Sequence, residues 1–185
     1  GQEITDLDEE KMDALELGWR LYTDSFNINA SVFMQDKSNF IFQDSNRQNV
    51  SNGETEHNGA EVSASYSLND NIYINANVSY AEHNYTNDLT LARTSIKGNE
   101  IDTAPRFMGS AQLGWNINPS LLTELSLQRM GNYYLNPENS AEYAGHTLLD
   151  FNLRYAYSEQ LVLSANIYNL LDEDYAERAD SAFGN

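Results

Sequence analysis

Apolar and polar residues alternate along most of this chain, and a period of two is the pattern of β-strands with two different faces. In residues 71–80 (NIYINANVSY) every second residue is apolar, from Ile72 to Tyr80, and the residues between them are Asn, Tyr and Ser. Residues 107–117 and 148–157 repeat this pattern. The alternation predicts about eight strands, at residues 13–23, 25–43, 49–68, 71–85, 104–117, 121–134, 146–157 and 160–169.

The connections between the predicted strands alternate in length. Four are tight turns of residue types that bond their own backbone, at 23–25, 69–71, 118–120 and 158–160. The three between them are longer and polar, near 44–48, 86–103 and 135–145. Because consecutive antiparallel strands place alternate connections at opposite ends of the sheet, we expect an all-β, antiparallel up-and-down meander with one rim of turns and one of loops. The alternation slips at 36–39, which predicts a β-bulge.

Two kinds of barrel fit this period: a soluble barrel is polar outside, whereas a membrane barrel is apolar outside. Several predicted strands exceed the usual soluble length of about 5–6 residues. The second face is rich in Asn, Ser, Gln and Gly, which suits a hydrated lumen, so we interpret the sheet as a segment of a transmembrane β-barrel. The charged residues of that face, which we expect to form a mostly structural polar network, are Glu16, Arg20, Glu61, Glu124, Asp150 and Arg154.

Aromatic residues lie near the ends of the predicted strands. Amphipathic rings prefer the headgroup level of a membrane, so this placement predicts two aromatic girdles. The expected members are Tyr66, Trp115, Tyr155 and Tyr157 at the turn rim, and Tyr80, Tyr85, Tyr133 and Tyr134 at the loop rim.

Composition excludes several functions. The net charge is −18, with 28 acidic and 10 basic residues, which argues against nucleic-acid binding. The chain has no Cys and three His, and we expect no metal site, cofactor or catalytic residue, because no nucleophile motif occurs. His57 and His83 each follow a Glu, but adjacent side chains in a strand point to opposite faces. A chelating pair would therefore need a cross-strand partner, which the alternation alone does not identify.

Four stretches carry a family resemblance. Residues 169–180 (NLLDEDYAERAD) resemble the N-L-x-D-x-x-Y motif near the end of TonB-dependent outer-membrane receptors. The stretches 11–20 (KMDALELGWR), 55–62 (TEHNGAEV) and 104–106 (APR) resemble other parts of the same family, in the family's order. Each motif is weak alone, but four in the family's order are fairly specific, and the resemblance runs over nearly the whole chain.

The resemblance implies a bacterial outer-membrane barrel of about 22 strands with a plug inside it. Such a receptor takes up a scarce nutrient, often a ferric siderophore, with energy transmitted by TonB. We expect this chain to be a fragment of one, truncated at both ends, and unable to transport alone. Its partners would be the plug, the remaining strands, outer-membrane lipid, a small-molecule ligand and, through the whole receptor only, TonB.

Within that frame we expect three regions: an acidic lead-in at 1–12, a barrel wall at 13–169, and an acidic loop at 170–185 that leads to missing final strands. Cationic and aromatic side chains near the loops would suit an anionic or planar ligand. The candidates for this ligand mouth are Arg93, Lys97, Tyr133, Tyr134, Tyr143, His83 and His146.

Two alternatives remain open from the sequence. One is a complete small outer-membrane barrel with a structural or adhesion role, closed by pairing of the first and last of its eight strands. The other is a soluble ligand-binding β-barrel. A reading frame extended in both directions separates the first from a receptor fragment, and monomeric behaviour without detergent would support the second.

Overall fold

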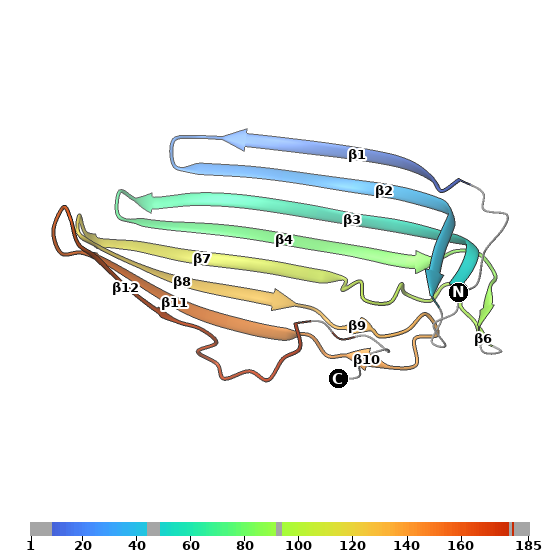
Figure 1. Ribbon diagram of the computed structural model, residues 1–185. Coiled ribbons are helices and arrows are strands. Elements are labelled where there is room, and N and C mark those ends of the chain that lie inside the picture. Colours follow the sequence, from blue (N-terminus) through green and yellow to red (C-terminus); the bar gives the residue numbers. More distant parts are fainter. Residues whose placement is uncertain (1–8, 44–48, 92–93, 178, 180–185) are drawn as a thin grey trace.

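A single antiparallel sheet makes up most of the computed structural model, which describes residues 9–43, 49–91, 94–177 and 179. Figure 1 shows its long strands side by side. In chain order and in spatial order they are β1 (Lys11–Tyr22), β2 (Phe26–Gln43), β3 (Asn49–Asn69), β4 (Ile72–Tyr85), β7 (Phe107–Asn118), β8 (Leu121–Met130), β11 (His146–Ala156) and β12 (Val162–Ile167). The expected all-β meander is confirmed, because chain neighbours are sheet neighbours throughout.

Two long connections contain a short hairpin each. In the first, β5 (Thr90–Leu91) pairs with β6 (Thr94–Ser95), and in the second, β9 (Tyr133–Tyr134) pairs with β10 (Glu142–Tyr143). Both hairpins lie at the same end of the sheet (Figure 1).

Some strands differ in length from the prediction. The strand expected at 104–117 begins only at Phe107, because Pro105 has no N–H to donate to the ladder. The strand expected at 121–134 ends at Met130. There the chain passes close to Gly145, which has a φ of +76° and no room for a Cβ against the Met130 and Gly131 carbonyls. The two following tyrosines therefore join a separate hairpin.

Each of the four short turns is closed by a side chain of its own first residue. In the second turn, Asn69 Oδ1 accepts the N–H groups of Asn71 and Ile72, both at 2.9 Å. The equivalent acceptors in the other turns are Thr23, Asn118 and Ser158. All four turns lie at one end of the sheet and the two described long connections at the other (Figure 1), as the alternation of lengths predicts.

The predicted bulge lies where β2 pairs with β3. The register shifts between Lys37 and Phe40, and Asn39 between them has a φ of 59°. The Asn39 side-chain amide donates to the carbonyl of Glu9 at 2.8 Å. The bulge thus also fixes the chain that leads into β1.

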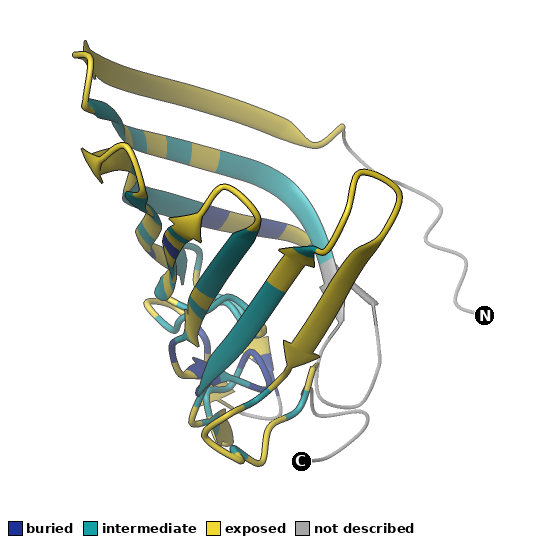
Figure 2. Cartoon of the chain, turned by 90° about the vertical axis from the view of Figure 1, so that its left-hand side faces the viewer, coloured by how far each residue is buried: buried dark blue, intermediate teal, exposed yellow. Residues whose placement is uncertain are grey.

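One face of the sheet is apolar and exposed on all eight strands. Its exposed large apolar side chains have exposed fractions from 38% at Val62 to 71% at Leu15, and Figure 2 shows how little of β1 and β12 is covered. Other members of this face are Leu17, Trp19, Val32, Met34, Ile74, Val78, Leu113, Trp115, Leu125, Leu127, Tyr155, Leu163 and Ile167. Among the described residues no element packs over this face, so the sheet lacks the second layer that a soluble sheet needs.

Most of the buried apolar side chains lie instead in the long connections, at the adjoining end of β4 and in the segment after β12. One cluster contains Tyr85, Leu91 and Ile96, and the other contains Tyr133, Leu135 and Ala179. Tyr85 and Tyr133 are only 1% and 5% exposed, so these two do not belong to the expected aromatic girdle. Tyr66, Tyr80, Trp115, Tyr155 and Tyr157 are exposed, as a girdle requires.

The sheet is open within the described part of the chain. β1 and β12 each have a single strand neighbour, so the pairing of first and last strands that a closed eight-stranded barrel requires is not formed. Unpaired edge strands expose backbone donors and acceptors to further strands. In the same residues there is no helix of the length and apolarity needed to span a membrane.

Candidate functional site

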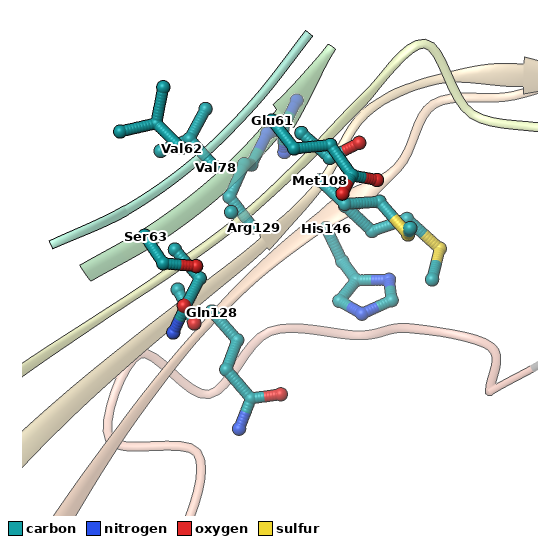
Figure 3. Close-up of a pocket in the computed structure, with 13 residues that line it drawn as sticks. Glu61, Val62, Ser63, Val78, Met108, Gln128, Arg129 and His146 are labelled. Atoms are coloured by element: carbon teal, nitrogen blue, oxygen red, sulfur yellow. The ribbon is translucent and has the colours of Figure 1, made fainter. Parts of the chain in front are cut away.

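A hollow of about 420 Å³ lies on the polar face toward the loop rim. It follows one rung of the sheet, in which register partners on successive strands lie side by side. The rung consists of Glu61, Ser79, Met108, Met130 and His146. Figure 3 shows Glu61, Met108 and His146 on this side of the sheet, with Val62 and Val78 pointing away.

The next rungs toward the turn rim carry amides and hydroxyls. Ser63, Asn77, Ser110 and Gln128 form the first of them. Further along, Asn75 accepts from Ser65 Oγ at 2.9 Å and donates to Gln112 at 3.3 Å. These groups give a hydrated surface of small polar side chains, as the sequence predicts for a lumen.

Glu124 is the expected lumen charge with the most side-chain partners. Its Oε1 accepts from Tyr73 Oη at 2.7 Å and from Gln112 Nε2 at 3.1 Å. Asp150 accepts the backbone N–H of Asn169 at 2.8 Å.

The other expected lumen charges, Glu16, Arg20, Glu61 and Arg154, lie on the same face, but they form no ion pair among the described residues. The ion pairs there are Lys37–Glu10, Arg106–Glu82 and Arg106–Glu100. The proposed network therefore remains a prediction for most of its members.

Three of the expected mouth residues lie together. His146, 7% exposed, has Nδ1 2.8 Å from Tyr143 Oη, and its ring centroid lies 4.8 Å from that of Tyr175. The rings of Tyr133 and Tyr143 are 5.3 Å apart. These rings form one aromatic cluster at the edge of the hollow.

The cluster holds the segment that follows β12. Tyr133 Oη lies 3.1 Å from both the N and the O of Ala179, and Tyr143 Oη accepts the N–H of Ala176 at 3.2 Å. Tyr133 and Tyr143 thus use their hydroxyls on this chain's own backbone. The sequence identified both tyrosines as candidates, but it did not predict that they would hold the chain's own backbone.

The NLLDEDY stretch forms a compact turn that begins at Asn169. Its side-chain amide donates to the Glu173 carbonyl and accepts the Glu173 N–H, both at 3.0 Å. Asn169 has a left-handed φ of 51°, which Asn tolerates better than most residues. The turn directs Tyr175 onto His146.

The two long connections are joined to one another. Asn139 accepts the N–H of Glu100 and donates to its carbonyl, both at 2.8 Å. Asn99 donates to the Pro137 carbonyl at 2.9 Å. Burial and the neighbouring Asp102 carboxylate raise the pKa of Tyr85, so its hydroxyl stays a donor to Asp102, at 3.0 Å.

The remaining mouth candidates are scattered. Lys97 is exposed and Tyr134 is half-buried, whereas Arg93 lies outside the described residues. His83 lies opposite His57 across β3 and β4, and their Nδ1 atoms are 2.8 Å apart. Each histidine is thus the cross-strand partner of the other. Alternation alone did not identify this partner because it does not give the strand register.

The described residues contain no group of three or more His, Cys, Asp or Glu side chains placed to hold a metal ion.

Comparison with known proteins agrees with this architecture. The model of the family described as TonB dependent receptor-like, beta-barrel matches residues 2–170. No curated protein matches the chain.

Several solved structures are similar. The ferric yersiniabactin uptake receptor FyuA from Yersinia pestis is 21% identical with a TM-score of 0.77, over 89% of this chain and 25% of that chain. The unliganded ferric citrate transporter FecA is 20% identical with a TM-score of 0.81, over 92% and 28%. The copper transporter OprC is 21% identical with a TM-score of 0.77, over 97% and 28%.

These likenesses, all below 25% identity, show the fold. The chain spans about a quarter of the length of these solved structures. With the family model matching residues 2–170 of 185, the chain belongs to the TonB-dependent receptor-like β-barrel family.

Proposed function

We propose that this chain is part of the wall of an outer-membrane receptor that takes up a scarce nutrient, a ferric siderophore. The observation that carries the proposal is the contrast between the two faces of the sheet. Leu15, Leu125 and their neighbours make one face apolar and exposed, whereas the other face carries the amides around Gln112. A membrane barrel needs this arrangement, with lipid outside and water inside.

The partners of the wall follow from its surfaces. The apolar face contacts outer-membrane lipid, and the edges β1 and β12 pair with further strands of the receptor. The polar face lies against a plug, and TonB acts through the whole receptor. With a net charge of −18, the chain is unsuited to nucleic acid.

The long connections contribute to the ligand mouth. Lys97 is exposed there, and its ammonium group suits an anionic chelate. The hollow beside Glu61 and His146 is open to solvent from the lumen side. The solved structures named for ferric yersiniabactin and ferric citrate uptake support a ferric chelate as the cargo. The family's role in transport supports a receptor rather than an enzyme.

The test is uptake by bacteria that express the whole receptor and lack other siderophore receptors. Cells receive radiolabelled iron as catecholate, hydroxamate or carboxylate chelates, or radiolabelled copper, with a TonB-deficient strain as the control. We expect TonB-dependent accumulation of one ferric chelate class. Uptake of copper alone, or of no iron chelate, would contradict the siderophore proposal.

A further inference from the structure

His57 and His83 form an imidazole pair on the lumen face, above the apolar band. They are register partners on β3 and β4. The outward residues beside them, Glu56 and Glu82, are charged, so the pair lies past the level at which lipid contacts the wall. Both rings are half-buried, which leaves part of each accessible from the lumen.

The geometry points to a binding site for a divalent copper ion between these two rings. The two Nδ1 atoms are 2.8 Å apart, and the ring centroids are 5.0 Å apart at an interplanar angle of 57°. Metal–imidazole bonds are about 2.0–2.1 Å long, so two of them at a right angle place their nitrogens about 2.9 Å apart. A right angle between adjacent ligands is the geometry of tetragonal Cu²⁺.

Other divalent ions fit less well. A tetrahedral site such as that of Zn²⁺ would separate the two nitrogens by about 3.3 Å. Cu²⁺ also binds nitrogen ligands most tightly among the first-row divalent metals. The two remaining in-plane positions would take water or donor atoms of a bound ligand, because the described residues supply no third metal-binding side chain beside the pair.

Thr55 provides a hydrogen-bond partner for the second ring nitrogen of His57. The Oγ1 atom of this buried residue lies 3.0 Å from His57 Nε2. An Nε2–H that donates to Thr55 leaves a lone pair on Nδ1, and hydrogen bonds of this kind commonly orient metal-binding histidines. With His57 in this tautomer, His83 Nδ1–H donates to that lone pair in the metal-free pair, and on metal binding His83 would carry its proton on Nε2 instead. This move of the proton from Nδ1 to Nε2 changes the tautomer of His83 without releasing a proton.

The surroundings keep the rings neutral, as metal binding requires. Burial, with His83 and Lys37 as further causes and Asp36 opposing them, lowers the pKa of His57. Burial also lowers the pKa of His83. The net charge of −18 favours cations near the wall. The inference is independent of which nutrient the receptor transports.

The test is Cu²⁺ titration of the whole receptor in detergent, followed by electron paramagnetic resonance. The variants are His57→Gln, His83→Gln and the double variant, and His146→Gln is the matched control because it is the chain's remaining histidine. We expect the difference between wild type and double variant to be one Cu²⁺ with hyperfine coupling to two imidazole nitrogens. Each single variant should weaken this binding at least about tenfold, a loss of about 1.4 kcal/mol.

Folding is checked by the heat-dependent gel mobility of each variant. His146→Gln should leave the two-nitrogen signal unchanged. Binding that survives in the double variant, or that is lost equally in His146→Gln, would overturn the inference. So would single variants that bind as tightly as wild type, since a chelating pair needs both rings.

Discussion

At the scale of single residues, the clearest dependence of structure on side-chain size is at Gly114. This glycine lies between Tyr73 and Glu124 on one rung of the sheet. The Tyr73 ring crosses over it to donate to Glu124 at 2.7 Å. A Cβ at position 114 would overlap the Tyr73 ring.

We therefore predict that Gly114→Ala displaces Tyr73 and breaks its bond to Glu124. Loss of this hydrogen bond to a carboxylate costs about 1.5–3 kcal/mol of unfolding free energy. The measurement is the urea-induced unfolding of the whole receptor in detergent. Gly18→Ala is the control, because the nearest atom to its Cβ would be 3.7 Å away. Equal stabilities of the two variants would show that Tyr73 has room to move.

The residue types in the sequence predicted where aromatic and basic side chains gather, but they did not predict what these side chains contact. Tyr133, Tyr143 and His146 stood out in the sequence as aromatic or basic groups near a loop, and the structure brings them together. The role of the two tyrosines in holding Ala176 and Ala179 depends on contacts across more than 30 positions of the chain. Such contacts leave no local pattern in the sequence.

At the scale of elements, the alternation of side chains carried most of the information. It predicted the order and direction of all eight long strands, because each has an apolar face and a polar face. It failed where that contrast ends. β8 stops at Met130 and β7 starts at Phe107, where Gly145 and Pro105 decide the backbone path. The small hairpins of the long connections escaped prediction because two-residue strands show no periodicity.

The turn at Asn169 offers a test of one such connection. Asn169→Ala removes two hydrogen bonds to Glu173 and places a Cβ without side-chain compensation at a φ of 51°. Asn169→Gly removes the same bonds but accepts this φ. We expect faster amide exchange at Glu173 in both variants, measured by mass spectrometry.

The increase in the amide exchange rate at Glu173 should differ between the two variants. Left-handed backbone costs a non-glycine residue about 1–2 kcal/mol, so Asn169→Ala should exchange about tenfold faster than Asn169→Gly. If the alanine variant exchanged as slowly as wild type, neither the side chain nor the backbone angle of Asn169 would matter for this turn.

At the scale of the whole molecule, the described part of the chain forms no core in the sense of a soluble domain. Most of its buried apolar groups lie in two clusters at the loop rim, and the apolar face of the sheet is open. In the proposed receptor, lipid on one side and polar groups with water on the other would replace the second layer. Stability of the sheet therefore depends on the strands that would pair with β1 and β12.

A spin-label scan along β8 of the whole receptor in lipid bilayers tests most directly whether the apolar face of the sheet lies in the membrane. Labels are placed one at a time at outward Leu125 and Leu127 and at lumen-facing Ser126 and Gln128. Collisions with oxygen, which concentrates in lipid, are compared with collisions with a water-soluble nickel complex. We predict high oxygen access at 125 and 127 and high nickel access at 126 and 128. The opposite phase, or equal access at all four positions, would contradict a barrel wall with its apolar face in the membrane.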